Sequence, residues 1–214
     1  MNVRVCDAVK YIGPDCVLDH ISIDIKPGQV TGLSGSNGSG KTMLMRAVCG
    51  LIHLDEGSIF VDEKILSTDL AFPPNLGMCI EGPAFLEGRT GYENLRLLAD
   101  ITGKVGTKEI RASMKRVGLD PDLKKKYRNF SLGMKQRLGI AAAIMERPDL
   151  LVLDEPSNAL DSQGVEMLMD VLRMECGRGC AVLLSCHDGR ILESMANTIY
   201  SMHSGRIIEV TSNE

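Results

Sequence analysis

The sequence GSNGSGKT at residues 35–42 constrains the fold of this chain more than any other stretch. An apolar run at 30–33 precedes it, and apolar residues at helical spacing follow it. A strand, a glycine-rich loop and a helix in this order are typical of a phosphate-binding loop, because glycine permits backbone angles that point successive N–H groups at phosphate oxygens. A flexible Gly/Ser turn is the alternative. The flanking strand and helix and the adjacent Lys-Thr pair favour binding of a nucleoside triphosphate.

The residue types within this loop predict separate roles. Lys41 would lie over the β and γ phosphates, and Thr42 would offer its hydroxyl to Mg²⁺. The helix that follows directs the positive end of its dipole at the same phosphates. The predicted nucleotide contacts in the loop are Ser36, Asn37, Gly38, Ser39, Gly40, Lys41 and Thr42.

A second motif, LLVLDEP at residues 150–156, supplies acidic groups. Its four apolar residues predict a short buried strand that ends at Asp154 and Glu155. Two acids at a strand end would equally fit a surface position if they stood alone. Together with the phosphate loop they predict that Asp154 holds Mg²⁺ through its water shell and that Glu155 polarises the water that attacks the γ phosphate.

His187 follows another apolar run, at residues 181–184. In open α/β sheets, ligands bind at the carboxyl ends of the strands, so this histidine is placed to reach a γ phosphate. A loop histidine without a role is the alternative interpretation.

The segment FSLGMKQRLGIAAAIM at residues 130–145 predicts a long helix with Ser131 as its N-cap. The serine hydroxyl, the backbone N–H of Gly133 and the positive end of the helix dipole together make a second anion site. The chain is therefore predicted to carry two phosphate-binding surfaces.

The remaining sequence alternates between strand and helix patterns. Isoleucines alternate with polar residues at 21–25 and predict a half-buried strand. Thr90 and Glu93 predict a capping box that opens a helix within a helical insertion at 85–128, and Asp161 is placed to cap a later helix. Further strands are predicted at 58–61, 76–80, 181–184, 198–202 and 206–210.

Two residues keep two interpretations each. Tyr11, in a chain with four Tyr, four Phe and no Trp, could stack on an adenine ring or be an ordinary packed or surface tyrosine. Glu81 ends an apolar strand and could reach a metal or a water in a cleft, or lie in an exposed loop. The sequence by itself does not separate these alternatives.

The composition of the chain limits the classes of partner and the location that we expect. The 214 residues carry a formal net charge of −4, so no electrostatic footprint for nucleic acid is present and no nucleic-acid partner is expected. Polar residues interrupt positions 1–13, which argues against a signal peptide, and no apolar run approaches the roughly 20 residues that span a bilayer. We therefore expect a cytoplasmic protein that is peripheral on the inner face of the cell membrane and held there only by partners.

Taken in order, the phosphate loop, FSLGMKQR, LLVLDEP, NALD at 158–161 and His187 make the chain resemble the ATP-binding subunit of an ABC transporter over nearly its whole length. The resemblance implies a single α/β domain of the ABC-type P-loop NTPase class. It implies a RecA-like core with an antiparallel β subdomain at 1–83 and 147–214, and a helical subdomain with the signature motif at 84–146. It also implies that two copies, identical or paralogous, enclose two ATP molecules and act on separate transmembrane subunits.

The resemblance assigns further roles residue by residue. Tyr11 would stack on adenine, and Ser131 and Gly133 would contact the γ phosphate held by the other copy. Asp161 would link the two active sites, and His187 would be the γ-phosphate switch. The predicted catalytic residues are Lys41, Glu155 and His187, and the predicted metal ligands are Thr42, Asp154 and Glu81.

Two stretches depart from the family pattern. Glu81 stands where the family usually has Gln, and Phe-Ser-Leu-Gly-Met stands where it usually has Leu-Ser-Gly-Gly-Gln. Ser131 and Gly133 are kept, so closure on phosphate is expected to survive. Glu81 together with FSLGMKQRLGIA resembles the bacitracin-resistance and lantibiotic-immunity type of exporter.

We therefore predict ATP hydrolysis that drives substrate movement, with export favoured. The alternative is a soluble ABC-type ATPase that acts on DNA or ribosomes. DNA-repair members carry long coiled coils between loop and signature, and no sustained heptads separate Thr42 from Ser131. Ribosome-acting members carry two cassettes, and one is present here.

Overall fold

A parallel sheet made from the short apolar runs of the sequence forms the centre of the fold. The computed structural model describes residues 1–212. In it, β3 (Val30–Ser34), β8 (Ala181–Ser185), β7 (Leu150–Leu153) and β6 (Leu76–Cys79) lie side by side in that order, each parallel to its neighbour. Three of these strands, β3, β8 and β7, are buried on both faces, and such strands have mainly apolar sequences.

Two strands near the C-terminus extend this sheet on the other side of β3. The first, β9 (Thr198–His203), runs parallel to β3, and β10 (Arg206–Ser212) returns antiparallel to it, so the six-stranded order is β10-β9-β3-β8-β7-β6. A separate antiparallel sheet has the order β2-β1-β4-β5. Its strands are β1 (Val3–Ile12), β2 (Asp15–Ile25), β4 (Glu56–Val61) and β5 (Lys64–Ile65).

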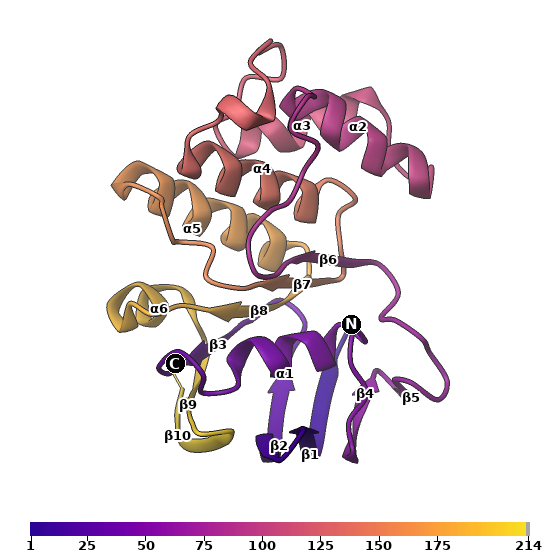
Figure 1. The fold of residues 1–214 in the computed structure, drawn as a ribbon, viewed down its shortest axis with the longest axis vertical. Helices are drawn as coiled ribbons and strands as arrows, with labels where there is room; N and C mark the ends of the chain where they lie inside the picture. The colour runs from indigo at the N-terminus through magenta and orange to yellow at the C-terminus, as the bar shows by residue number, and fades with distance from the viewer. Residues whose placement is uncertain (213–214) are drawn as a thin grey trace.

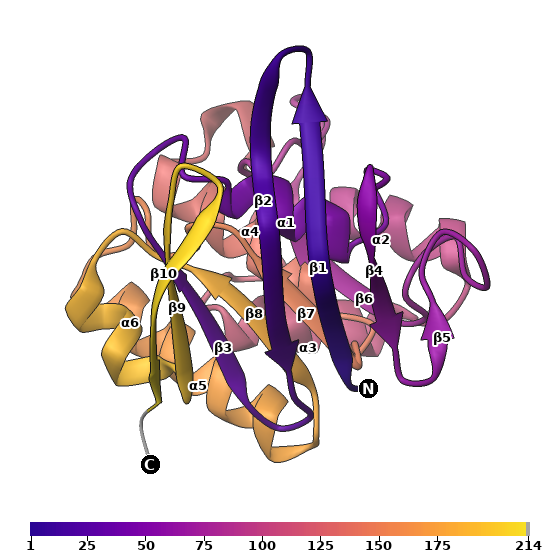
Figure 2. The ribbon, with the colours of Figure 1, turned by 90° about the horizontal axis from the view of Figure 1, so that it is seen from below.

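Helix α1 (Lys41–Val48) lies between the two sheets (Figure 2). Its buried residues share one apolar core with β1, β2 and one face of the central sheet. The alternating pattern at 21–25 supplies part of this core, because Ile21, Ile23 and Ile25 are all buried. The phosphate loop is therefore anchored at the junction of three layers.

The other face of the central sheet is covered by helices. Helices α5 (Ser162–Gly177) and α6 (Gly189–Met195) flank the sheet, and α2 to α4 lie together at one end of the molecule (Figure 1). That group holds α2 (Gly91–Thr102), α3 (Thr107–Arg116), a 3₁₀ turn η1 (Tyr127–Asn129) and α4 (Leu132–Ile144). The predicted capping box is present, since the Glu93 N–H donates to Thr90 Oγ1 at 3.2 Å and the Thr90 N–H donates to Glu93 Oε2 at 2.7 Å.

The apolar core under these helices is continuous across the boundaries predicted at residues 84 and 146. Leu95, Ile110 and Leu138 of the helical group belong to the same buried cluster as Leu151 and Leu184 of the central sheet. The division of the chain into a core and a helical subdomain thus stays a prediction. Within residues 1–212, no helix has the length and apolar character needed to cross a membrane.

Candidate functional site

At two positions, the loop before α1 has a backbone conformation and close neighbours that only glycine tolerates. Gly35 has φ +142° and Gly40 has φ +104°. A Cβ on Gly35 would lie 2.3 Å from the Met202 carbonyl oxygen, and one on Gly40 would lie 2.7 Å from the Val17 carbonyl oxygen. Such approaches are too close for a side chain, so these glycines let the loop pack against β9 and β2 while its interior stays open.

Lys41 places its ammonium group inside this loop. The side chain is almost fully buried, and Nζ donates to the carbonyl oxygens of Gly35 at 2.7 Å and Ser36 at 3.1 Å. Within the described part of the chain, no carboxylate forms an ion pair with it. Its charge is therefore left for an anion, as a phosphate-binding lysine requires.

Thr42 and Asp154 meet beside the loop. Thr42 Oγ1 donates to Asp154 Oδ2 at 2.8 Å, and Ser185 Oγ donates to Asp154 Oδ1 at 2.6 Å. A hydroxyl and a buried carboxylate at this spacing are the hard oxygen ligands that Mg²⁺ takes together with phosphate oxygens and water. The donor set fits the predicted metal.

Glu155 is held next to Asp154 in a left-handed backbone conformation, with φ +49°. Its N–H donates to Ser185 Oγ at 2.8 Å, and the His187 N–H donates to its Oε2 at 3.0 Å. Its Oε1 is buried without a hydrogen bond, although His187 Nε2 lies 3.2 Å away. Burial raises the pKa of Glu155, and the nearby His187 and Lys41 only partly offset this. A carboxylate with one free oxygen and a raised pKa is suited to accept a proton from water.

These groups surround one hollow of about 240 Å³. Ser39 Oγ, which is also buried, has no hydrogen-bond partner there within residues 1–212. Two orphaned polar atoms and an unneutralised ammonium group indicate that a polar ligand completes the site. The hollow is lined by Val17, Asn37, Gly38, Ser39, Gly40, Lys41, Thr42, Met43, Asp154, Glu155 and His187.

The second predicted anion site lies apart from this hollow. Ser131 caps α4, and the Met134 N–H donates to its hydroxyl at 3.2 Å. A Cβ on Gly133 would lie 2.9 Å from the Ala159 carbonyl oxygen, so this position packs tightly on the loop after Glu155. We call Ser131, Leu132 and Gly133 the signature surface; Ser131 and Leu132 are exposed, and no residue of this surface lines the hollow.

Asp161 is also outside the hollow. It caps α5 by accepting from the Gly164 N–H at 2.8 Å, and its Oδ1 lies 3.5 Å from Arg137 Nη2 of α4. The carboxylate therefore contacts both α5 and α4, which we call the signature helix because it begins at the signature surface. Its role in linking two active sites stays a prediction.

Tyr11 lies near the end of β1 and pairs with Cys16 across the hairpin to β2. The ring is half-exposed, and the Cys16 thiol is the main cause that raises the pKa of its hydroxyl. Val17 on β2 lines the hollow but Tyr11 does not. Its stacking role stays a prediction.

Glu81 is engaged away from the hollow. Its backbone has φ +59°, and its carboxylate forms an ion pair with the guanidinium of Arg46 on α1. Both residues line a separate groove of about 640 Å³ between β6, α2 and α4. Contact with a metal would require this ion pair to break, so the metal role of Glu81 stays a prediction.

Sequence reasoning missed Ser185 and Arg46. Ser185 is fully buried and positions both acids, since its hydroxyl donates to Asp154 and accepts from the backbone of Glu155. Its place at the end of an apolar strand was the available signal. Arg46 had no comparable signal, because its partner lies 35 residues away in the sequence.

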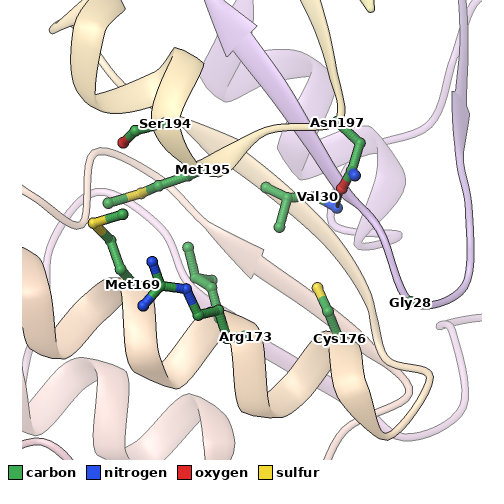
Figure 3. Close-up of a pocket in the computed structure, with 9 residues that line it drawn as sticks. Gly28, Val30, Met169, Arg173, Cys176, Ser194, Met195 and Asn197 are labelled. Carbon is green, nitrogen blue, oxygen red and sulfur yellow. Dashed lines mark hydrogen bonds between the residues drawn. The ribbon is translucent and has the colours of Figure 1, made fainter. Parts of the chain in front are cut away.

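A further hollow of about 280 Å³ lies between α5, α6 and the start of β3 (Figure 3). Met169 and Met195 approach each other across it, and Cys176 faces it from α5. Burial raises the pKa of the Cys176 thiol to about 11, so the thiol stays protonated at neutral pH. None of the predicted site residues lines this hollow.

Residues 18–158 match the family model described as ABC transporter. The uncharacterized ABC transporter ATP-binding protein YybJ of Bacillus subtilis is 42% identical over 96% of this chain and 94% of its own length. The bacitracin transport ATP-binding protein BcrA of Enterococcus faecalis is 36% identical over 94% of this chain. The lantibiotic transport ATP-binding protein SrtF of Streptococcus pyogenes is 32% identical over 96% of this chain and 89% of its own length.

The chain spans about two thirds of the length of BcrA, 66%. Among solved structures, an ATP-binding subunit of an ABC transporter aligns with a TM-score of 0.88 and 25% identity, over 99% of this chain and 90% of that one. A dimeric ATP-binding cassette bound to ADP and Pi aligns with a TM-score of 0.88 and 22% identity, over 98% of each chain. The latter likeness is one of fold.

Proposed function

Since this chain belongs to the ABC transporter family, we propose that it closes with a second copy around ATP and drives export through separate membrane subunits. Membership in the family confirms the predicted ABC-type P-loop fold and the prediction of an ATP-binding, ATP-hydrolysing subunit that uses Mg²⁺. The observation that carries the proposed mechanism is the 240 Å³ hollow, where a free ammonium group, a hydroxyl-carboxylate pair and a carboxylate with one unpaired oxygen converge.

The proposed binding step uses groups that are already in place. Backbone N–H groups of the loop, the start of α1 and the Lys41 ammonium would hold the β and γ phosphates. Thr42 and Asp154 would hold Mg²⁺, which supplies charge neutralisation on the phosphate oxygens. Ser185 fixes the Asp154 carboxylate, so little reorganisation is needed when the nucleotide arrives.

For the hydrolytic step, Glu155 is the proposed general base. Its unpaired Oε1 would accept a proton from the attacking water, while Oε2 stays bound to the His187 N–H. His187 Nε2 is 3.2 Å from Oε1. It would lie beside the same water and would sense the γ phosphate. Replacement of Glu155 by Gln should keep ATP binding and nearly abolish turnover. Turnover close to that of the unchanged chain would remove Glu155 as the base.

A second copy is proposed to complete the site. The signature surface carries a capped helix N-terminus and an exposed serine but stands outside the hollow of its own copy. In a head-to-tail pair, Ser131 and Gly133 of one copy would contact the γ phosphate held by the other. Asp161, which touches Arg137 of the signature helix, is suited to transmit that contact to α5.

The groove between β6, α2 and α4 is the proposed docking site for the membrane subunit. Exposed apolar side chains line it, including Leu51, Met78, Leu98 and Ile101, and the Arg46–Glu81 pair stands at its side. A contiguous apolar groove with a polar rim is typical of a protein-binding surface. Docking there would hold the subunit at the inner face of the membrane, and the Arg46–Glu81 pair would join the docked segment to α1 behind the phosphate loop.

An affinity pull-down from detergent-solubilised membranes tests this docking. Ile101→Asp should abolish recovery of a multi-span membrane protein, because it puts a charge into the groove. Ile208→Asp is the matched control, since Ile208 is also exposed but lies on β10. Equal recovery with both variants would contradict the assigned surface, and recovery of ribosomes or DNA-bound proteins instead would contradict transport.

The relatives favour antibiotics of the bacitracin and lantibiotic kind as the exported class. BcrA is named for bacitracin transport and SrtF for lantibiotic transport. The chain spans 89% of the length of SrtF and 66% of that of BcrA. We therefore infer only the class of substrate that both names share.

A further inference from the structure

Charge is divided unevenly along this chain. Residues 84–146 carry 13 Lys and Arg against 7 Asp and Glu, a formal charge of +6. The other residues carry 11 Lys and Arg against 21 Asp and Glu, a formal charge of −10. The helices α2 to α4 of the positive segment stand at one end of the molecule and the antiparallel sheet at the other (Figure 1), so the net charge of −4 conceals a strong polarity.

Many of the cations gather beside the start of α4. The Tyr127 N–H donates to the Arg89 carbonyl oxygen at 2.8 Å, which joins the segment before α2 to η1. Lys135 Nζ lies 5.1 Å from the centre of the Tyr127 ring. These contacts bring Arg89 and Lys135 to η1, which ends two residues before Ser131. Arg128 lies within η1, and three lysines directly precede it in the sequence. We call these six residues the cationic cluster: Arg89, Lys124, Lys125, Lys126, Arg128 and Lys135.

Most of the cluster is not neutralised. Lys126 pairs with Glu93 at 3.3 Å, whereas Arg89, Lys124, Lys125 and Arg128 are exposed and form no ion pair in the part of the chain that the structure describes. Exposed like charges repel one another, and a bound anionic partner would relieve that repulsion.

The phosphate hollow lies in the acidic part of the chain. Asp154 and Glu155 line it beside Lys41, and Asp188 caps α6 directly after His187. It belongs to the segment with the formal charge of −10, and a bound nucleoside triphosphate would add further negative charge.

We propose that the cationic cluster is an association surface that draws a second, ATP-loaded copy of this chain onto the signature surface in head-to-tail orientation. The inference rests on the proposed function, because only in a two-copy sandwich does the signature surface meet the other copy's hollow. Two chains of −4 repel at a distance, but a polarised pair attracts when the positive end of each faces the ATP-loaded hollow in the acidic segment of the other. A head-to-head encounter would bring the two cationic clusters together, and their repulsion would disfavour it.

The salt dependence of dimerisation distinguishes an effect of this uneven charge distribution from an effect of net charge alone. If charge were evenly spread, added salt would screen the repulsion between two negative chains and strengthen the dimer. The cationic cluster predicts the reverse, so dimers of the Glu155→Gln chain with ATP should weaken as NaCl rises. The association rate, followed by stopped-flow light scattering, should fall in parallel.

Charge reversal at matched positions localises the effect. Lys124→Glu with Lys125→Glu, in the Glu155→Gln background at low salt, should slow association by about tenfold or more. Lys26→Glu with Lys64→Glu gives the same net charge from two exposed residues outside the cluster. This control should slow association much less and keep the salt dependence.

Each other outcome counts against the inference. Dimers that strengthen with salt, or equal slowing by both reversal pairs, would overturn it while the two-copy sandwich stands. Absence of an ATP-dependent dimer at every salt concentration would contradict the proposed function itself. Binding to vesicles of anionic phosphatidylglycerol that the cluster reversal abolishes, with dimer association unchanged, would assign the cluster to the membrane surface instead.

Discussion

The phosphate hollow and the signature surface are both built at helix N-termini, yet one is enclosed and the other is open. At the start of α1, Lys41 is 6% exposed and Asp154 is 8% exposed. At the start of α4, Leu132 is 70% exposed, and within residues 1–212 the hydrogen bonds of Ser131 are all to its own helix. A binding site that is preorganised within one copy and a second one that faces outward are what a shared active site requires. This difference indicates that one copy binds the nucleotide by itself and that a second copy is needed to complete the active site.

Among the changes considered, removal of the proposed general base in the phosphate hollow should lower activity most. Glu155→Gln should lower ATP turnover by about 10²–10⁴-fold, the usual contribution of a general base. ATP binding should persist, because Lys41 and the loop are unchanged. Steady-state phosphate release and nucleotide binding by calorimetry check this. A parallel loss of binding would mean that the substitution disturbs the loop rather than the chemistry.

A bulky side chain on the signature surface should have the next largest effect on activity. Ser131→Arg should leave nucleotide binding intact but block ATP-driven dimerisation, and turnover should fall by about 10²–10³-fold, as on loss of a transition-state contact. Light scattering and phosphate release measure the two effects. An unchanged dimer would contradict the role of the signature surface.

The buried ion pair between α3 and α5, outside both regions, should be the most sensitive point for stability. Glu175 on α5 is 1% exposed, and its Oε1 accepts from Arg116 Nη2 of α3 at 2.7 Å while Arg178 binds its Oε2. Arg116→Met should cost about 3–5 kcal/mol, because it leaves a buried charge without one of its partners. Addition of Glu175→Leu should recover much of this loss in urea denaturation. If both variants were equally destabilised, packing rather than charge would be the cause.

The raised pKa of Glu155 predicts opposite pH effects on activity and on stability. Hydrolysis needs the ionised carboxylate, so its acid limb should lie above the ordinary value of 4.5. Burial penalises the charged form, so the folded state loses stability as pH rises through the raised pKa. Glu155→Gln should therefore stabilise the chain at neutral pH, and the gain should vanish below about pH 4.5. Thermal unfolding of both chains across pH tests this; a gain that is independent of pH would contradict it.

The exposed contact between α4 and α5 should matter least for stability. Asp161→Asn keeps the helix cap and removes only the pairing with Arg137, which is worth about 0–1 kcal/mol at an exposed site. Asp161→Ala also removes the cap and should cost about 1 kcal/mol. Thermal unfolding separates the two variants. A fall in turnover with Asp161→Asn, at unchanged stability, would support its link between two sites.

The sequence alone predicted the enclosed half well, because its motifs fall at the ends of parallel strands. The runs that became β7 and β8 are continuously apolar, and the residues just after them meet at one edge of the sheet. Lys41, Thr42, Asp154, Glu155 and His187 are brought around one hollow for this reason.

Contacts between side chains far apart in sequence were beyond this reasoning. No local pattern signals that Ser185 serves both acids or that Arg46 binds Glu81. The continuity of the core across residues 84 and 146 was also invisible, because periodicity identifies a buried helix face but not the element that covers it. Helix α4 has apolar residues around its circumference, and only its packing shows that β6 and the other helices share them.

Mixing two inactive variants tests the central claim most directly. In a mixed pair, the Ser131→Arg chain keeps a complete hollow and the Glu155→Gln chain keeps an intact signature surface, so one of the two shared sites is whole. The account predicts that an equal mixture hydrolyses ATP well above the sum of the two variants measured separately. A mixed dimer that forms by light scattering yet shows no gain in turnover would contradict a site shared between two copies.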